Sequence, residues 1–310
     1  MSPTLAEVRG AARRLEGHVR CTPTLDAAVG RNPYPDLLLK LENLQVSGSF
    51  KARGALNKAL QVPAEARARG LVTASGGNHG LGVAYAGQRL GCAVRIFLPT
   101  STPAEKLRKL EAWGAEVVLE GAVWDEANLA ALAYAEAQGA IYVHPFADPE
   151  VIAGQGTVAL ECVEQAPERD LYLIAIGGGG LIAGCALALK ALRPDAIVIG
   201  VEPRGAATLQ RSIQAGELVT LDRLETAATS LAPRRSEALN LALIQAHVDE
   251  VVLVDDADLR DAARWLWDEF GLAVELSAAA AVAALRSGAY VPTPGRRPLA
   301  LVCGSGAPPA

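Results

Sequence analysis

A lysine follows a Ser-Gly-Ser turn in NLQVSGSFKARGA, residues 43–55, where the pattern changes to that of a helix. Only six of the chain's 29 basic residues are lysines. Arginine stays protonated in proteins, whereas a lysine removed from water loses its proton readily and becomes the nucleophilic amine that a Schiff base requires. Ser47, Gly48 and Ser49 let a ligand approach the backbone, and a helix start near Ser49 favours an anion nearby. Lys51 is therefore a candidate nucleophile, with a solvated first-turn lysine as the alternative.

A run of four glycines, Gly177–Gly180, separates a strand-like segment from a helix-like segment. At such a junction unhindered backbone N–H groups converge on a phosphate. The run also satisfies a loose dinucleotide-binding pattern, with Gly178, Gly180 and Ala183 in register and Glu202 about 20 residues later. That rival interpretation predicts a nicotinamide-dependent oxidoreductase, but it leaves the lysine segment without a role.

Two further glycine-containing segments follow strand-like runs. In TASGGNHG, residues 73–80, the backbone amides suit a carboxylate, and the Asn78 side chain offers both a donor and an acceptor. His79 is either an acid or base or, as is commoner for a first-turn histidine, a structural residue. In LVCGSG, residues 301–306, Cys303 ends the last strand-like run and is expected to be a buried thiol.

The elements that must position these residues are short apolar runs that alternate with longer helical ones. Continuous apolar runs suit strands buried on both faces, and the helical segments between them have the length of crossovers between parallel strands. The pattern predicts an α/β fold with mostly parallel, doubly wound sheets. The predicted strands are Leu37–Leu41, Leu71–Ala74, Val94–Leu98, Glu116–Leu119, Ile141–Val143, Leu171–Ile176, Ile197–Val201, Val251–Val254 and Leu299–Val302.

Two local patterns refine this prediction. In TPAE, residues 102–105, Thr102 is the expected N-cap, Pro103 the first helical residue and Glu105 the partner in a capping box. The uncharged run Leu171–Leu189 has about the length of a membrane span, but its glycines indicate a strand, a loop and a buried helix. We therefore expect no membrane association.

Length and composition bound the class of protein. A chain of 310 residues, 51% of them apolar, is long enough for two domains with well-developed cores. A net charge of −5 with both signs interspersed provides no basic stripe for nucleic acid and no polybasic membrane patch. Five scattered cysteines fit a reducing compartment, and charged residues precede any apolar run, so we expect no signal peptide and a cytoplasmic location.

Together these segments resemble the threonine/serine dehydratase and serine racemase family of pyridoxal-phosphate enzymes, in the tryptophan synthase β-like group of fold type II. The resemblance rests on KLENLQVSGSFKARGA for the Schiff-base segment, SGGNHG for the substrate loop, HPFADPEVIAGQGTVALE for the domain-crossing segment, GGGG for the phosphate loop and LVCGSG for the segment at the cofactor nitrogen. The five motifs occur in the family's order and cover nearly the whole chain.

The resemblance implies two doubly wound, mostly parallel αβα domains with pyridoxal phosphate between them and an amino acid as substrate. Residues 1–69 and 147–310 would form the large cofactor-binding domain, and residues 70–146 a small inserted domain with the substrate loop. Lys51 would carry the Schiff base, and the other cofactor-binding residues would be Phe50, Asn78, Gly177, Gly178, Gly179, Gly180 and Cys303. The substrate carboxylate would be surrounded by Ser75, Gly76, Gly77, Asn78 and His79. The family also implies a homodimer.

The residue that matches the family's partner of the cofactor ring nitrogen is Cys303. A neutral thiol does not supply the negative charge that keeps a pyridine nitrogen protonated. We therefore expect α,β-elimination, by which a β-hydroxy amino acid such as L-threonine or L-serine gives a 2-oxo acid and ammonia. Racemases of this type resemble one another in a serine where this chain has Gly76, so efficient racemisation is not expected. Serine racemase and the hydroxyaspartate and phenylserine dehydratases stay open as alternatives within the family.

Metal binding is the family feature with the least support in this chain. The metal-binding members use an acidic cluster that here matches Glu202 and the carbonyl of Ala206, but Thr208 stands where an aspartate is expected. The loss of a charged oxygen ligand disfavours a divalent cation. Thr229-Ser230 also replaces the family's Asp-Gly pair, which leaves the preferred substrate open.

Overall fold

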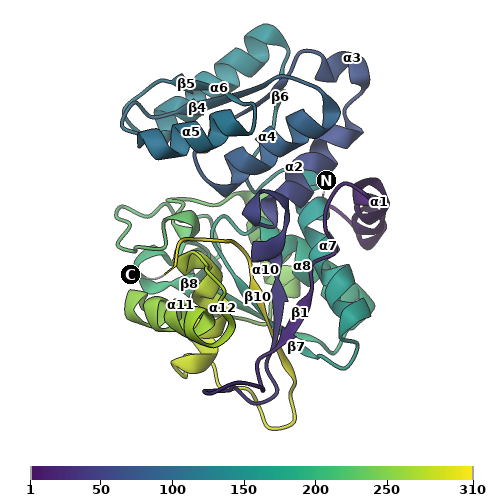
Figure 1. The fold of residues 1–310 in the computed structure, drawn as a ribbon, viewed down its shortest axis with the longest axis vertical. Helices are drawn as coiled ribbons and strands as arrows, with labels where there is room; N and C mark the ends of the chain where they lie inside the picture. The colour runs from purple at the N-terminus through teal and green to yellow at the C-terminus, as the bar shows by residue number, and fades with distance from the viewer. Residues whose placement is uncertain (1, 309–310) are drawn as a thin grey trace.

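The computed structural model describes residues 2–308 and contains two sheets, each covered by helices (Figure 1). The larger sheet has the strand order β1-β2-β10-β7-β8-β9 and is parallel except where β1 pairs with β2. Its strands are β1 (Thr24–Asp26), β2 (Leu38–Leu41), β7 (Leu171–Ala175), β8 (Ile197–Pro203), β9 (Glu250–Val254) and β10 (Pro298–Val302). The smaller sheet is parallel throughout, in the order β5-β4-β3-β6. Its strands are β3 (Leu71–Thr73), β4 (Val94–Leu98), β5 (Glu116–Leu119) and β6 (Ile141–Tyr142).

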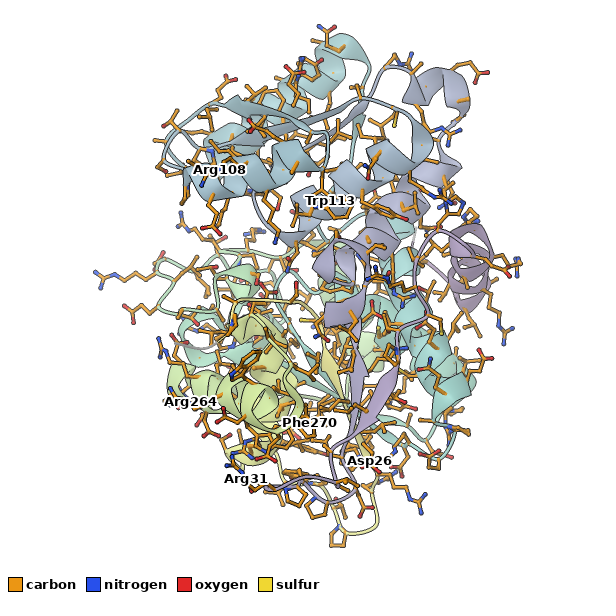
Figure 2. All side chains as sticks on the ribbon, in the orientation of Figure 1. Asp26, Arg31, Arg108, Trp113, Arg264 and Phe270 are labelled. Carbon is orange, nitrogen blue, oxygen red and sulfur yellow. The ribbon has the colours of Figure 1, made fainter. Side chains whose placement is uncertain are left out.

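Helices fill the connections between these strands. They are α1 (Leu5–Leu15), α2 (Lys51–Gln61), α3 (Ala64–Arg67), α4 (Asn78–Leu90), α5 (Ala104–Ala112), α6 (Trp124–Gln138), α7 (Pro149–Gln165), α8 (Gly180–Leu192), α9 (Thr208–Ala215), α10 (Ala238–His247), α11 (Asp256–Phe270) and α12 (Leu276–Arg286). Figure 2 shows the exposed side chains of Arg108 on α5 and Arg264 on α11, one from each sheet's helical layer. Within residues 2–308, no helix has both the length and the apolar character needed to cross a bilayer.

All nine predicted strands are present, and the predicted α/β class with mostly parallel sheets is confirmed. The run Leu171–Leu189 forms a strand, a loop and a buried helix, as predicted. Strand β1 escapes sequence analysis because it is three half-exposed residues rather than an apolar run. The predicted cap at Thr102 is wrong: α5 begins at Ala104, no side chain caps it, and the extended Pro103 is its N-cap.

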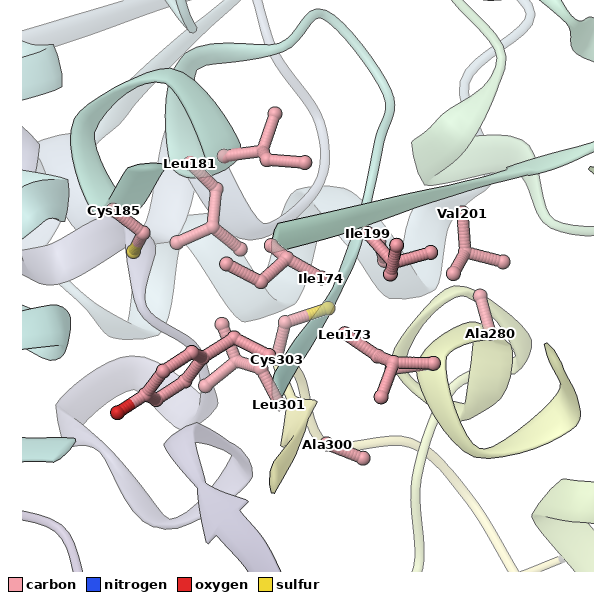
Figure 3. Close-up of a cluster of buried hydrophobic side chains, with 14 of the residues drawn as sticks. Leu173, Ile174, Leu181, Cys185, Ile199, Val201, Ala280, Ala300, Leu301 and Cys303 are labelled. Carbon is pink, nitrogen blue, oxygen red and sulfur yellow. The ribbon is translucent and has the colours of Figure 1, made fainter. Parts of the chain in front are cut away.

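The main core lies around the larger sheet (Figure 3). Helix α12 packs against this sheet with all residues from Ser277 to Leu285 buried, and its many alanines let the backbone lie close to the strands. A second cluster joins α2 and α4 to the smaller sheet through Leu56, Leu81 and Ile96. Helix α2 thus packs with the smaller sheet, although the predicted boundaries assign it to the large domain. Those boundaries stay a prediction.

Glycines set the close helix crossings that position the site. A Cβ atom on Gly154 of α7 would lie 2.7 Å from the Cα atom of Gly54 in α2. A Cβ atom on Gly156, two residues further along α7 and on a different face, would lie 2.7 Å from the carbonyl oxygen of Gly184 in α8. Backbones this close leave no room for a side chain. Helix α7 therefore lies between the helix of the lysine, α2, and the helix of the glycine loop, α8, and packs closely against both.

Candidate active site

Lys51 opens α2 directly after a tight turn. Gly48 in this turn has a left-handed backbone with φ +81°, and a Cβ atom on it would lie 2.3 Å from Ser305 Oγ. The Ser305 N–H donates to the Gly48 carbonyl at 2.7 Å, and the Phe50 N–H donates to the Cys303 carbonyl at 3.3 Å. The lysine segment and the glycine-rich segment after β10 therefore lie side by side, although about 250 residues separate them in the chain.

The Lys51 amine contacts groups from both parts of the molecule. Its Nζ donates to the carbonyl of Pro145, just after β6, at 2.5 Å, and it lies 5.1 Å from the centre of the Phe50 ring. Burial lowers the pKa of Lys51 to about 8, an effect that Cys303 and Glu275 oppose. A large fraction of the amine is then uncharged at mildly alkaline pH, which is the form that attacks a carbonyl. These surroundings support the nucleophile hypothesis over the solvated lysine.

The predicted substrate loop connects β3 to α4. Within it, the Gly77 N–H donates to Ser75 Oγ at 3.4 Å. A Cβ atom on Gly80 would lie 2.0 Å from the Ser75 carbonyl, and one on Gly82 would lie 2.9 Å from the Lys51 carbonyl group, so only glycine fits at either position. The start of α4 is thus pressed against its own loop and against the lysine.

Free backbone donors mark this loop as an anion site. Helix α4 has no side-chain cap, and the N–H groups of Asn78 and His79 have no acceptor within residues 2–308. Unpaired N–H groups at a helix N-terminus bind a carboxylate well. The backbone near the predicted residues Ser75, Gly76 and Gly77 therefore suits the carboxylate of an amino acid.

The His79 side chain has a structural role. The imidazole is buried, and its Nε2 lies 2.9 Å from the carbonyl oxygen of Val143. Burial, together with the nearby Lys51 charge, lowers the pKa of His79 to about 3, so the ring is neutral at physiological pH. The structure supports the structural alternative for this side chain: it fastens the start of α4 to the end of β6.

Glu275 joins the site, although the sequence did not single it out. Its Oε1 accepts a hydrogen bond from Asn78 Nδ2 at 2.8 Å, which links α4 to the start of α12. Burial raises the pKa of Glu275, and hydrogen bonds from Ser230 and Asn78 oppose the shift. The only sequence signal was an acidic residue directly before an apolar helix, and that pattern is usually a surface helix start.

The glycine loop lies between β7 and α8, as predicted. Helix α8 has no side-chain cap, and the N–H groups of Gly178, Gly179 and Gly180 find no acceptor in the described part of the chain. Gly179 has φ +90°, and a Cβ atom on Gly178 would lie 2.2 Å from the Phe146 ring. Gly177 is equally constrained, because its Cβ atom would lie 2.9 Å from a backbone carbonyl. The loop offers the unpaired donors that a phosphate requires.

Cys303 follows β10 and faces the main core (Figure 3). Its thiol is buried, with Sγ 3.9 Å from the Ser277 carbonyl oxygen. Burial raises the pKa of the Cys303 thiol far above its usual range, and the Glu275 charge adds to the shift. The thiol is therefore neutral, as the sequence analysis assumed.

Glu202 and Ala206 are neighbours at the end of β8, but the carboxylate is already engaged. Its two oxygens accept hydrogen bonds from the N–H groups of Leu209 and Gln210 at 2.8 Å each, which caps α9. Burial raises the pKa of Glu202 to about 7. The Thr208 hydroxyl donates to a backbone carbonyl at 2.7 Å. Across residues 2–308, no three His, Cys, Asp or Glu side chains gather into a possible metal site.

A lysine amine with a lowered pKa and a glycine loop with free N–H groups are features that suit an enzyme with a phosphorylated aldehyde cofactor. The chain matches the family of pyridoxal-phosphate dependent enzymes over residues 15–304, and it belongs to that family. The residues fit the cofactor, since Lys51 suits its aldehyde and the loop Gly177–Gly180 suits its phosphate. The nicotinamide interpretation of the glycine loop is therefore wrong.

Known proteins resemble the chain over most of its length. It is 39% identical over 283 residues to the L-threonine ammonia-lyase of Thermotoga maritima, covering 91% of this chain and 71% of that protein. It is 38% identical over 306 residues to the phenylserine dehydratase of Ralstonia pickettii, covering 98% and 93%. The structure of maize serine racemase superposes with a TM-score of 0.92 at 30% identity, covering 99% of this chain and 94% of that one. These neighbours confirm the predicted tryptophan synthase β-like fold.

Proposed function

We propose that the protein is a pyridoxal-phosphate-dependent ammonia-lyase that converts a β-hydroxy amino acid, such as L-threonine or L-serine, to a 2-oxo acid and ammonia. The observation that carries the proposal is the Lys51 amine, whose pKa burial lowers to about 8 and whose Nζ donates to the Pro145 carbonyl, next to Phe146, against which the glycine loop packs with its free N–H groups. The L-threonine ammonia-lyase and the phenylserine dehydratase among its relatives support the same reaction type.

Lys51 is assigned the proton transfer at the reacting carbon. Bound pyridoxal phosphate supplies an electron-withdrawing ring that stabilises negative charge at the amino acid Cα. The neutral Lys51 amine removes the Cα proton and holds it at Nζ. A pKa near 8 suits this task, because the amine is basic enough to accept the proton and deprotonated often enough to act.

The other residues orient the amino acid and tune the charge. The free N–H groups of Asn78 and His79 bind the substrate carboxylate and fix the direction of the Cα–H bond. The neutral Cys303 thiol leaves the ring nitrogen without a counter-charge, so negative charge at Cα is stabilised only moderately. Loss of the β-hydroxyl is therefore favoured over the slower addition of a proton to the other face of Cα.

Racemisation needs a second proton carrier opposite Lys51. Gly76 has no side chain, and the atoms nearest to a Cβ atom built on it are aliphatic carbons of Leu98 and Lys106. Gly76 itself therefore supplies no proton carrier. Elimination is therefore proposed to exceed racemisation by a wide margin.

The experiment is a substrate panel. Purified protein, saturated with pyridoxal phosphate, is given L-threonine, L-serine, phenylserine or threo-3-hydroxyaspartate, and 2-oxo acid and ammonia are measured in the same samples. The proposal predicts equal amounts of both products from at least one of the four. Absence of both products from all four would contradict it, and the ranking of the four names the substrate.

We also infer a homodimer in the cytoplasm. The family resemblance supports the dimer, and five cysteines without a disulfide in the described residues support a reducing compartment. Light scattering tests the first inference: the mass should be twice the chain mass of 32.2 kDa. Cell fractionation tests the second.

A further inference from the structure

Trp124 contacts the backbone at the entry to the substrate loop. It is the first residue of α6, and its indole Nε1 donates to the carbonyl oxygen of Ala74 at 2.6 Å. Ala74 is fully buried and directly precedes Ser75. No other donor within residues 2–308 reaches this carbonyl. The position where the loop leaves β3 therefore depends on one indole N–H group.

Hydrogen bonds also hold the loop that leads into Trp124. Gly121, in the loop after β5, has φ +81°, and its carbonyl accepts hydrogen bonds from both the N–H and the hydroxyl of Thr100 at 2.9 and 3.1 Å. The Ala122 N–H donates to Glu126 Oε2 at 2.6 Å. These bonds join the loops after β4 and β5, and Trp124 extends the connection to the loop after β3. Three strand ends of the smaller sheet thus form one frame.

The core does not require a tryptophan at this position. The residues that α6 buries against the smaller sheet are Ala127, Ala131 and Ala135, whereas the Trp124 side chain is 41% exposed. A large ring left partly in water, with its one polar atom turned inward to a carbonyl, indicates a role for that hydrogen bond beyond packing.

We propose that Trp124 is a positioning residue for substrate binding, which it serves by holding Ala74 so that the loop's N–H groups face the substrate carboxylate. This inference rests on the proposed function. The far end of the loop is held separately, by Asn78 on Glu275 and by His79 on Val143. Because the cofactor residues Lys51 and Gly177–Gly180 lie on other elements, loss of the indole N–H acts on substrate affinity and spares cofactor binding.

The test is Trp124→Phe, which removes the donor and keeps an aromatic ring. With the best substrate of the panel, KM should rise about tenfold while kcat stays within about twofold and cofactor content is unchanged. Hydrogen–deuterium exchange in the cofactor-loaded protein should become faster at residues 75–77 and not in the core. Trp113→Phe is the matched control (Trp113 is labelled in Figure 2). That ring follows α5 and packs edge-on against Tyr85 at 6.1 Å, so the same change there should leave KM and loop exchange unaltered.

An unchanged KM, or a fall in kcat with loss of cofactor, would overturn the proposal. If Trp124→Phe does not fold, Thr100→Val removes one bond of the same frame and should raise KM about two- to threefold with the same exchange pattern. No change in Thr100→Val would also overturn it. If the wild-type protein acts on none of the panel substrates, the proposed function fails, and exchange at residues 75–77 alone decides the role of Trp124.

Discussion

Two single residues are proposed to set the chemistry of the site, Lys51 by its charge and Gly76 by its missing side chain. Lys51 sits where burial disfavours its ammonium form, so its pKa falls to about 8 from an ordinary 10.5. Gly76 is proposed to lie on the opposite face of the substrate, where glycine has no side chain that could carry a proton.

The lowered pKa of Lys51 predicts a pH dependence. Since the neutral amine is the reactive form, the rate at which cofactor-free protein captures pyridoxal phosphate should rise with pH through about 8 and level off above it. Below that value the amine is protonated and capture is slow. Stopped-flow absorbance between about pH 6 and 10 measures the rate. A rise centred near 10.5, the ordinary value for lysine, would contradict the desolvated site.

At Gly76, a new proton carrier should change the reaction partition. A Cβ atom there would lie 3.3 Å from the flexible end of Leu98, so Gly76→Ser fits after a small shift. We expect the D-serine formed per pyruvate from L-serine to increase about tenfold or more in this variant. Chiral chromatography measures both products, and Gly76→Ala controls for the added volume. Wild-type protein that makes D-serine as fast as pyruvate would refute the role of Gly76.

At the scale of elements, α7 is the part that brings the site together. It crosses α2 at Gly154 and α8 at Gly156, with backbone atoms where side chains would otherwise lie. These two crossings fix two positions relative to α7: that of the lysine at the start of α2 and that of the glycine loop at the start of α8. The close helix packing at these two crossings thus explains the glycines in HPFADPEVIAGQGTVALE.

Gly156→Ala should accordingly destabilise the protein by about 2 kcal/mol, because its Cβ atom would press on the Gly184 carbonyl of α8, which is backbone and cannot turn aside. Urea unfolding measures the loss. Gly10→Ala in α1 is the control, since the nearest atom there is the flexible end of Arg14, at 3.3 Å. That variant should lose nothing and gain up to about 1 kcal/mol from helix propensity. Equal stability of the two variants would speak against the crossing.

Sequence patterns predicted the elements better than the contacts between them. The apolar runs identified nine strands, and the glycine segments identified two strand-to-helix loops with free N–H groups, because such features are local. Glu275 and Pro145 were missed, because each contacts a site residue that is distant in the sequence and is brought near it by the tertiary fold. The cap expected at Thr102 failed because Pro103 adopts an extended backbone that starts the helix one residue later than its type suggests.

At the scale of the whole molecule, the candidate site lies between the part built on the larger sheet and the part built on the smaller sheet. Asn78 from α4 bonds Glu275 at the start of α12, and Lys51 from α2 bonds Pro145 after β6. Each side supplies part of the site, so amino-acid binding and cofactor binding are assigned to different elements of one chain. The site therefore combines residues from both parts of the molecule, joined by a few polar contacts, and neither sheet with its helices contains all of it.

The engaged carboxylate of Glu202 leads to a prediction for the whole enzyme. Because that group caps α9 and Thr208 brings no charge, magnesium should have little to bind. Turnover should stay within about twofold after treatment with a chelator and after addition of magnesium, as measured by 2-oxo acid release. Activity that a chelator abolishes and magnesium alone restores would show that a cation site exists.

Covalent binding of the cofactor to Lys51, and the dependence of the reaction on this lysine, can be measured together. The cofactor-loaded protein is reduced with borohydride, digested and mapped by mass spectrometry, with turnover measured in parallel for Lys51→Ala. We expect the reduced cofactor on the peptide that contains Lys51. In Lys51→Ala we expect no such adduct and turnover lowered at least about a thousandfold. An adduct on another lysine of the wild-type protein, or near-normal turnover in Lys51→Ala, would contradict this role of Lys51.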